Sequence, residues 1–256
     1  MSLAARWLLL DLQGVLYQEG KVLEGAVDAL RRLQGAGLGI RYLTNTTTRP
    51  RAEIAGRMRA MGFDVEDGHV FTPAAAAIGV LNERGARRIH LAAESTLAED
   101  FAAFELVESR PDAVVMGDLY RDFTWERLDA LYAMLRDGAR LVALHKNRYC
   151  MRDGALGLDL GPFVAALEYA ADREAVVVGK PSDAFFAMAL ADMGAKRVET
   201  AMVGDDIGSD IAGGAEAGLI TVQVRTGKYS RADDAAPVRP TLRLDRFADL
   251  PAALGL

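Results

Sequence analysis

Short runs of apolar residues alternate along the chain with longer stretches in which apolar residues recur at helical spacing. Residues 7–10 form such an apolar run before Asp11, and residues 26–33 have the spacing of an amphipathic helix. Further pairs of an apolar run and a helical stretch follow at residues 40–43 and 51–61 and at residues 176–178 and 184–193. Alternating strands and helices are typical of a parallel sheet with helices on both faces. The pattern predicts a doubly wound α/β fold in which these runs are neighbouring strands.

The middle of the chain repeats the same rhythm. Residues 89–92, 113–116 and 141–144 indicate strands, and residues 125–136 indicate a helix. A further helix is expected after residue 72, with Thr72 as its N-cap and Pro73 in its first turn. We therefore expect an α/β cap at residues 77–178, inserted into a core formed by residues 1–76 and 179–256.

Composition and charge narrow the classes of protein that this chain can belong to. Its 256 residues are 51% hydrophobic and 26% charged, which is typical of a globular protein. The net charge of −6 argues against a nucleic-acid partner, and no uncharged apolar run approaches the 18 residues of a membrane span. The single cysteine, Cys150, excludes an intramolecular disulfide and a thiolate metal cluster. These features favour a cytoplasmic protein.

Polar residues follow the apolar runs of the outer parts of the chain, which include a further strand-like run at residues 200–203. They are Asp11, then Thr44 and Asn45, then Lys180, and finally Asp205 and Asp206 with Asp210 nearby. Because parallel strands end at one edge of a sheet, we expect these side chains to converge there. Carboxylates suit a hard cation, and hydroxyl, amide and ammonium groups suit phosphate oxygens. The set indicates a Mg²⁺-dependent site for phosphoryl transfer.

Four segments carry a resemblance to a known family. DLQGVLY, YLTNTTTRP, VVVGKP and AMVGDDIGSDIAG, in this order, resemble the four motifs of the haloacid dehalogenase superfamily of phosphatases. The inserted middle part resembles the subgroup with a large α/β cap between the second and third motifs. The stretch LHKNRYCMRDGALGLDLGPFVAALEYA is similar to the branch that contains phospholysine phosphohistidine inorganic pyrophosphate phosphatase. The resemblance covers nearly the whole chain.

The resemblance implies a catalytic or phosphate-binding role for four residues. Asp11 matches the nucleophile, which would attack phosphorus and become an aspartyl phosphate. Lys180 matches the lysine that neutralises charge between the phosphate and the nucleophile. Thr44 matches a residue that hydrogen-bonds the phosphoryl group, and Asn45 follows it in the subgroup signature.

The resemblance also implies a set of ligands for Mg²⁺. Asp11 and Asp205 match the carboxylate ligands, and the backbone carbonyl of Gln13 completes the protein's contribution. Asp210 matches an acidic position that supports the metal or its waters, and Asp206 could share that role.

Gln13 departs from the family pattern. The family usually has an aspartate two residues after the nucleophile, which protonates the leaving group and later activates water. An amide can do neither, and such proton transfer is typically worth about 10²–10⁴-fold in rate. We therefore expect slow hydrolysis of simple phosphate esters. Acyl phosphates, pyrophosphate and phosphoramidates should suffer least, because their leaving groups need little protonation.

Several interpretations stay open at this stage. His145, Lys146 and Asn147 could select the substrate from the cap, or could form a solvated turn. The substrate is expected to be a small phosphorylated molecule, and a homodimer is a family expectation. The alternatives to a phosphatase are a phosphate-binding or interaction protein that has lost catalysis at Gln13, and a phosphotransferase that passes the phosphoryl group to another acceptor.

Overall fold

The chain forms two compact units, and the second is inserted into the first. A computed structural model describes residues 5–152 and 155–256, except for the side chains of residues 151, 152, 155 and 156. The first unit takes the chain up to Thr44, Arg51–Phe71 and Lys180–Leu256. The second unit takes Asn45–Pro50 and Thr72–Gly179. The chain therefore passes between the units at residues 44/45, 50/51, 71/72 and 179/180, compared with the expected boundaries at 76/77 and 178/179.

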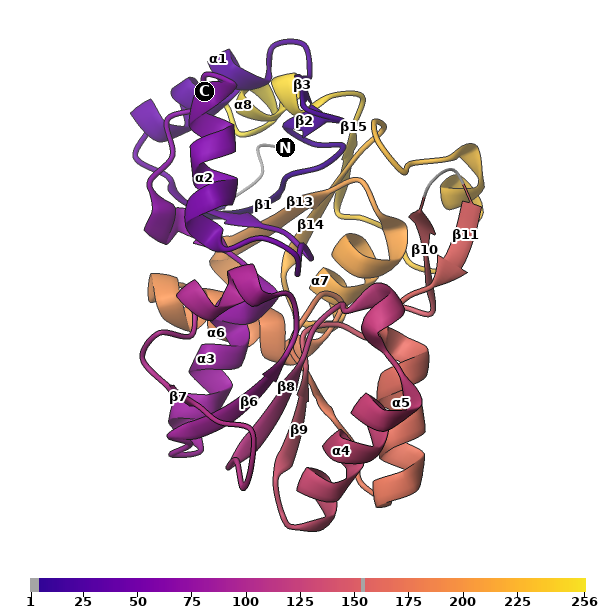
Figure 1. The fold of residues 1–256 in the computed structure, drawn as a ribbon. Coiled ribbons are helices and arrows are strands. Elements are labelled where there is room, and N and C mark those ends of the chain that lie inside the picture. The colour runs from indigo at the N-terminus through magenta and orange to yellow at the C-terminus, as the bar shows by residue number, and fades with distance from the viewer. Residues whose placement is uncertain (1–4, 153–154) are drawn as a thin grey trace. The chain divides into compact units, whose positions relative to one another are not determined.

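A parallel sheet forms the centre of the first unit. Its strands are β1 (Trp7–Asp11), β4 (Gly39–Leu43), β5 (Val70–Phe71), β13 (Thr200–Gly204), β14 (Ile220–Val224) and β15 (Leu242–Leu244). They pair in the order β15-β14-β13-β1-β4-β5, so N-terminal and C-terminal strands lie side by side (Figure 1). The central strand β1 pairs in parallel with β13 and β4, which brings the carboxyl ends of these three strands together.

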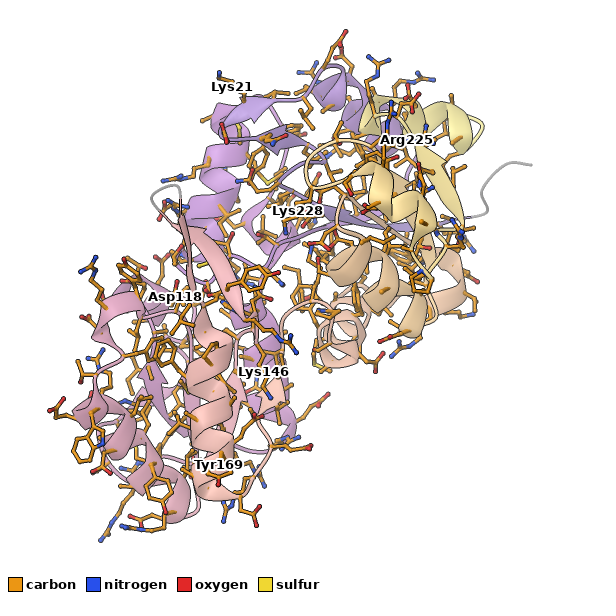
Figure 2. All side chains as sticks on the ribbon, turned by 90° about the vertical axis from the view of Figure 1, so that its right-hand side faces the viewer. Lys21, Asp118, Lys146, Tyr169, Arg225 and Lys228 are labelled. Atoms are coloured by element: carbon orange, nitrogen blue, oxygen red, sulfur yellow. The ribbon has the colours of Figure 1, made fainter. Side chains whose placement is uncertain are left out.

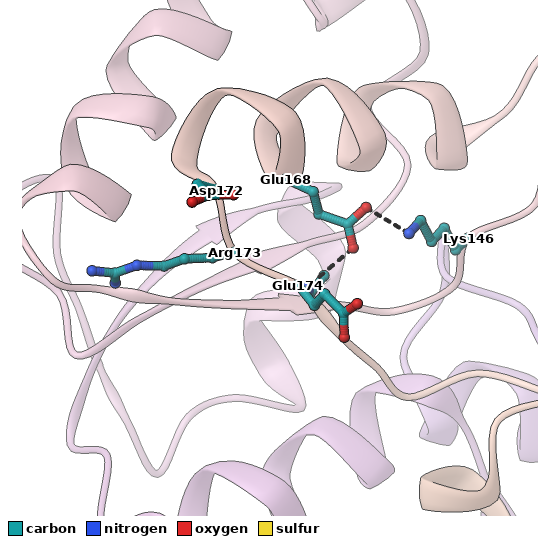
Figure 3. Close-up of a pocket in the computed structure, with 6 residues that line it drawn as sticks. Lys146, Glu168, Asp172, Arg173 and Glu174 are labelled. Atoms are coloured by element: carbon teal, nitrogen blue, oxygen red, sulfur yellow. Dashed lines mark hydrogen bonds and ion pairs between the residues drawn. The ribbon is translucent and has the colours of Figure 1, made fainter.

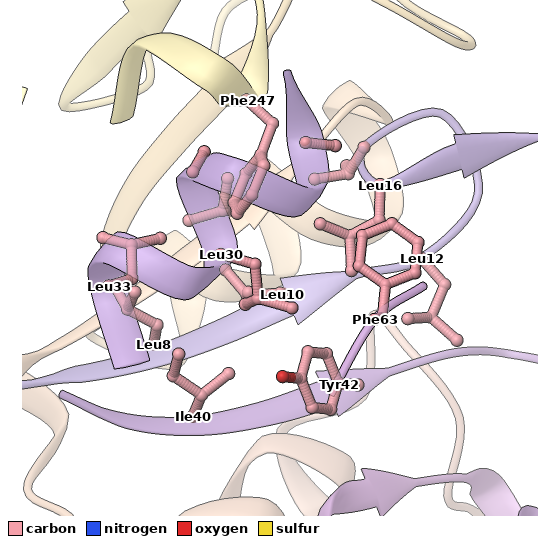
Figure 4. Packing of buried hydrophobic residues seen from close by; sticks show 14 of the residues in the cluster. Leu8, Leu10, Leu12, Leu16, Leu30, Leu33, Ile40, Tyr42, Phe63 and Phe247 are labelled. Atoms are coloured by element: carbon pink, nitrogen blue, oxygen red, sulfur yellow. The ribbon is translucent and has the colours of Figure 1, made fainter. Parts of the chain in front are cut away.

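Helices cover both faces of this sheet. They are α1 (Ala26–Gly35), α2 (Arg51–Ala60), α6 (Asp183–Met193), α7 (Gly213–Glu216) and α8 (Leu250–Ala253). On one face, Leu8 and Leu10 of β1 pack with Leu30 and Leu33 of α1 in one buried cluster (Figure 4). On the other face, Gly214 of α7 lies against the side chains of Met202 in β13 and Thr221 in β14. Helix α7 also contacts α6. The predicted doubly wound α/β fold is confirmed.

A second parallel sheet forms the centre of the second unit. Its strands are β6 (Arg88–Ala92), β7 (Glu105–Leu106), β8 (Ala113–Met116), β9 (Arg140–Ala143) and β12 (Val176–Val177), in the order β12-β9-β8-β6-β7. The sequence places residues 176–178 both among the strands of the outer parts and at the end of the cap, and the first of these two expectations is wrong. Val176 and Val177 pair with Val142 and Ala143 of β9 and form an edge of the second sheet. The sequence of a short β-branched run does not determine which sheet the run joins, because its strand partner is set by tertiary packing.

Helices α3 (Pro73–Glu83), α4 (Trp125–Arg136) and α5 (Leu160–Ala171) complete the second unit. Thr72 caps α3 by accepting a hydrogen bond from the N–H of Ala75, and Pro73 lies in the first turn, as predicted. Two antiparallel hairpins were not expected from the sequence. One joins β2 (Tyr17–Gln18) to β3 (Lys21–Val22) in the first unit, and the other joins β10 (Tyr149–Arg152) to β11 (Ala155–Leu158) in the second. Within the described residues, no helix has both the length and the apolar character needed to cross a membrane.

Gly179 is the last residue of the second unit and is tightly enclosed. A Cβ atom at this position would lie 2.4 Å from the carbonyl oxygen of Leu144 and 3.1 Å from the Cβ atom of His145. It would also lie 3.3 Å from Oδ1 of Asn45, the first residue of this unit. Any larger residue at position 179 would therefore displace backbone directly before Lys180.

Asp112 ties together the starts of neighbouring strands in the second unit. Its Oδ2 atom accepts hydrogen bonds from the backbone N–H groups of Arg87, at 2.8 Å, and Arg88, at 2.9 Å. Its carbonyl oxygen accepts a hydrogen bond from the N–H of Arg140. The hydrogen bonds from the Arg88 and Arg87 N–H groups lower the pKa of the Asp112 carboxyl group. The folded state therefore favours the charged form of the Asp112 side chain.

Asp112→Ala should lower the free energy of unfolding by about 1 kcal/mol at pH 7, because two backbone donors lose a charged acceptor at an exposed site. A lowered pKa stabilises the fold above the ordinary pKa of about 3.8, and this contribution disappears as the pH falls through the lowered value. Urea unfolding at pH 7 and pH 3 measures the difference. The control Asp129→Ala, on the exposed face of α4, should change stability by less than about 0.5 kcal/mol. Equal losses at the two positions would contradict this role.

Candidate active site

The ammonium group of Lys180 lies at the centre of the candidate site. Lys180 is the first residue of the chain's return to the first unit and is 4% exposed. Its Nζ atom donates a short hydrogen bond to Oδ1 of Asp11 and a second one, of 2.7 Å, to Oδ1 of Asp210. Asp11 ends β1, and Asp210 lies in the helical turn Ile207–Ala212 after β13. The sheet order thus brings together residues that are far apart in the sequence.

Three buried carboxylates gather around this ammonium. Asp11, Asp205 and Asp210 each place one carboxylate oxygen within 4.8 Å of the others. Both oxygens of Asp210 have partners, because Oδ1 receives Lys180 and Oδ2 receives the backbone N–H of Asp206 at 3.2 Å. When all the groups are ionised, three carboxylates face the Lys180 ammonium and two negative charges are left over. The cluster could hold a metal ion.

This excess of negative charge shifts the pKa values in the cluster. Burial raises the pKa of Asp11 to about 7, with Asp210 and Asp205 acting in the same direction and Lys180 against them. Burial also raises the pKa of Asp205 to about 6, although the Lys228 N–H opposes this shift. Burial would lower the pKa of Lys180, but Asp11 and Asp210 raise it above its usual range. The lysine therefore stays charged, and the carboxylates lack compensating positive charge.

Asp206 has a different task from its neighbour Asp205. Its Oδ1 atom accepts hydrogen bonds from the N–H groups of Gly208, at 2.9 Å, and Ser209, at 3.0 Å, and so caps the turn that carries Asp210. Its Oδ2 atom lies 2.9 Å from Nζ of Lys228. Burial would raise the pKa of Asp206, but the Ser209 N–H and the Lys228 ammonium lower it to about 2. Asp206 is thus held as an anion by the turn and by Lys228.

Backbone approaches Asp205 and Asp210 so closely that only glycine fits. A Cβ atom on Gly14, which has a φ of +77°, would lie 2.1 Å from Oδ2 of Asp205. A Cβ atom on Gly204 would lie 2.3 Å from Cβ of Asp210. Glycine at these positions lets the end of β13 and the loop after Asp11 approach the two carboxylates.

The loop after β14 belongs to the site, which the sequence reasoning missed. The N–H of Lys228 donates to Oδ2 of Asp205 at 2.7 Å, and a Cβ atom on Gly227 would lie 1.9 Å from the same oxygen. By sequence alone, Arg225 and Lys228 lie in a glycine-containing loop, for which a surface role is the default. Arg225 does pair at the surface, with Asp245. The available signal was position: this loop follows β14, the strand next to the one that ends before Asp205.

Three further predicted residues lie near the ends of the same strands. Gln13 is exposed, two residues after the buried Asp11. Thr44 is buried directly after β4, and its N–H donates to the carbonyl oxygen of Phe71. Asn45 follows Thr44 directly and is the first residue of the second unit. The roles of these three residues stay predictions.

The predicted substrate residues of the cap have structural partners inside the second unit. His145 is 4% exposed, its Nε2 atom lies 3.7 Å from Oδ1 of Asp159, and its Nδ1 atom accepts from the N–H of Asn147. Lys146 forms a 2.5 Å ion pair with Glu168. That pair borders a polar cavity of about 480 Å³, whose other lining residues are Asp172, Arg173, Glu174 and Ala175 (Figure 3). Asn147 accepts the N–H of Gly161 through its carbonyl oxygen. Selection of substrate by this trio stays a prediction.

Two family models match the chain. The model described as haloacid dehalogenase-like hydrolase matches residues 8–106, and a second haloacid dehalogenase hydrolase-like model matches residues 177–250. The human haloacid dehalogenase-like hydrolase domain-containing protein 2 is 40% identical over 237 residues, which are 93% of this chain and 90% of the relative. The phospholysine phosphohistidine inorganic pyrophosphate phosphatase of Danio rerio is 37% identical over 252 residues, which are 96% and 91% of the two chains.

Solved structures are similar over almost the same length. The chain resembles a 4-nitrophenylphosphatase from Thermotoga maritima with a TM-score of 0.89 at 27% identity, and 98% of each chain is covered. It resembles NagD from Escherichia coli K-12 with a TM-score of 0.86 at 28% identity, over 96% of this chain and 98% of NagD. The chain therefore belongs to the haloacid dehalogenase-like hydrolase family, as its motifs predict, and is a phosphohydrolase of that family.

Proposed function

We propose that this hydrolase is a Mg²⁺-dependent phosphatase that acts on a small phosphorylated molecule through an aspartyl phosphate. The observation that carries the proposal is the buried cluster of Asp11, Asp205 and Asp210 around Lys180, with its unbalanced negative charge. Carboxylate oxygens and a deficit of positive charge suit a hard divalent cation. The names of the relatives, a pyrophosphate phosphatase and a 4-nitrophenylphosphatase, point to the same chemistry.

Asp11 and Asp205 would hold the ion, together with the backbone carbonyl of Gln13. Asp210 and Asp206 would act from outside, because their oxygens already bind Lys180, backbone N–H groups and Lys228. A bound Mg²⁺ supplies charge neutralisation at the phosphoryl oxygens and a template for their orientation. Asp11 and Asp205 are the two carboxylates whose pKa values burial raises, so a bound cation would stabilise their charged forms most.

The residues of the chain divide the phosphoryl transfer between them. A carboxylate oxygen of Asp11 attacks phosphorus, a new O–P bond forms, and the bond to the leaving group breaks with its electron pair. The Lys180 ammonium reduces the repulsion between the Asp11 carboxylate and the anionic phosphoryl group. The Thr44 hydroxyl and the Asn45 amide donate to phosphoryl oxygens. Attack by water on the aspartyl phosphate then releases phosphate and restores Asp11.

Gln13 is proposed to set the preferred class of substrate. Its amide cannot protonate a leaving group or activate water, so both half-reactions lose general acid–base help. Phosphate joined to a good leaving group, as in an acyl phosphate, pyrophosphate or a phosphoramidate, depends least on this help. The second unit would act as a cap that selects among such substrates, and its motion would exclude water during the reaction. A cytoplasmic location and a homodimer stay predictions.

The first test is a screen of pyrophosphate, phosphoramidates, sugar phosphates and aryl phosphates with Mg²⁺. Asp11→Asn should lower turnover of every accepted substrate by about 10³-fold or more, because the nucleophile is lost. Asp28→Asn, an exposed change on α1, is the matched control and should keep full turnover. Binding of Mg²⁺ and phosphate by the wild-type protein without any turnover would instead indicate a phosphate-binding protein.

The second test is Gln13→Asp, which should raise turnover of an aryl phosphate at least about tenfold by restoring a general acid and base. Turnover of pyrophosphate should rise less, because its leaving group needs less protonation. The same change at the exposed Gln18 is the control. If Gln13→Asp is folded and no faster, the role assigned to Gln13 is wrong.

The third test uses the charge imbalance in the absence of metal. With a chelator present, wild-type protein should lose stability relative to Asp11→Asn as the pH rises from 4 to 8. The raised pKa of about 7, against an ordinary 3.8, favours the folded state at low pH, and this contribution is lost as the pH approaches 7. The loss can reach about 4 kcal/mol at pH 8, and Mg²⁺ should reduce it. Urea unfolding measures it, and a pH-independent difference would contradict the proposed cluster.

A further inference from the structure

The loop that follows β14 contacts both the loop after Asp11 and the two consecutive aspartates after β13, Asp205 and Asp206. The Thr226 hydroxyl donates a short hydrogen bond to the carbonyl oxygen of Gly14, three residues after Asp11. The backbone N–H of Lys228 donates to Oδ2 of Asp205 at 2.7 Å. The side-chain Nζ of the same lysine lies 2.9 Å from Oδ2 of Asp206. Lys228 thus binds two consecutive carboxylates, one with its backbone and one with its side chain. Figure 2 labels the position of Lys228.

Glycine backbone encloses the oxygen that the Lys228 N–H binds. Gly14 and Gly227 have φ angles of +77° and +60°, and a Cβ atom on Gly227 would lie 2.6 Å from the Cα atom of Gly14. The same Cβ atom would lie 1.9 Å from Oδ2 of Asp205. This oxygen therefore occupies a slot between two glycines and ends on an N–H donor, which fixes the rotation of the Asp205 carboxylate.

The Lys228 side chain fixes the neighbouring acid in a different orientation. Asp206 directs Oδ1 to the N–H groups of the following turn and Oδ2 to the Lys228 ammonium. This turn carries Asp210, which binds Lys180. The Lys228 side chain is 72% exposed, so it is not needed to fill the core. Its contacts assign Asp205 to the cluster with Asp11 and Asp206 to the cap of the turn.

We propose that Lys228 is a positioning residue for phosphoryl transfer, which holds Asp205 and Asp206 in their separate orientations. The inference rests on the proposed function and extends it to a loop outside the four sequence motifs. Lys228 acts through the two aspartates. Without the Lys228 side chain, the two carboxylates should be held less firmly in their separate orientations. The oxygens of Asp205 would then be less well placed to bind a metal ion.

The deciding experiment measures Mg²⁺ binding to Lys228→Met by isothermal titration calorimetry, with kcat and KM for an aryl phosphate. The methionine keeps the backbone N–H and most of the side-chain length but removes the charge. Positioning predicts Mg²⁺ binding about tenfold weaker and kcat about tenfold lower, with KM changed by less than about twofold. A lysine that acts only through its charge predicts the opposite, because removing a cation beside the site strengthens Mg²⁺ binding. Unchanged or tighter binding therefore overturns the proposal.

Three further variants complete the experiment. Lys228→Arg should recover most of the Mg²⁺ affinity, since it keeps the charge next to Asp206. Gly227→Ala should weaken Mg²⁺ binding at least as much as Lys228→Met, because its Cβ atom displaces the Asp205 oxygen; wild-type affinity in this variant overturns the proposal. Lys21→Met, on an exposed strand of the β2–β3 hairpin, is the matched control and should bind Mg²⁺ as the wild type does.

The wild-type arm separates this inference from the proposed function. If the wild-type protein hydrolyses a phosphorylated substrate with Mg²⁺, and Lys228→Met binds the ion as tightly as the wild type, only the positioning role fails. If the wild-type protein neither binds Mg²⁺ nor hydrolyses any phosphate, the proposed function and the positioning role both fail.

Discussion

A buried ammonium must be matched by nearby negative charge, because the protein interior cannot solvate it as water does. Lys180 meets this condition through Asp11 and Asp210, which lie 169 and 30 residues away in the sequence. The three charged groups stay together because β1 and β13 are adjacent in the sheet and the turn after β13 folds back over its end. Register, strand order and turn geometry in the first unit thus meet in one ion cluster, and the proposed chemistry depends on it.

The aspartates near this cluster are chemically identical but have different surroundings. Asp210 is fully occupied by Lys180 and a backbone N–H, and Asp206 is held as an anion by N–H groups and Lys228. Asp11 and Asp205 are buried with too little positive charge, and their pKa values are raised. The environments therefore separate two acids that maintain the structure from two that would bind a cation.

The sequence predicted the parts of the structure that local chemistry determines. The cap of Thr72 and Pro73 on α3 and the position of Asp11 at a strand end follow from residue type and neighbouring periodicity. Residues 176–178 were placed in the wrong sheet, because strand partners are set by tertiary packing and a three-residue run does not encode them. Lys228 was missed because its contribution to Asp205 comes from a backbone N–H, which every residue except proline has. The role of Gly227 was missed as well, because it depends on a contact in space with Gly14, which is far away in the sequence.

The close packing around Gly179 limits how the second unit could be exchanged during evolution or in a designed chimera. The chain first leaves the first unit after Thr44 and returns to it for the last time at Lys180, so two of the four junctions adjoin residues of the proposed chemistry. A graft that moved one of these two junctions by one residue would replace Thr44 or Lys180, or put a Cβ atom at position 179 against the Leu144 carbonyl. An exchange of the inserted unit would therefore have to keep glycine at position 179, whatever else it changes.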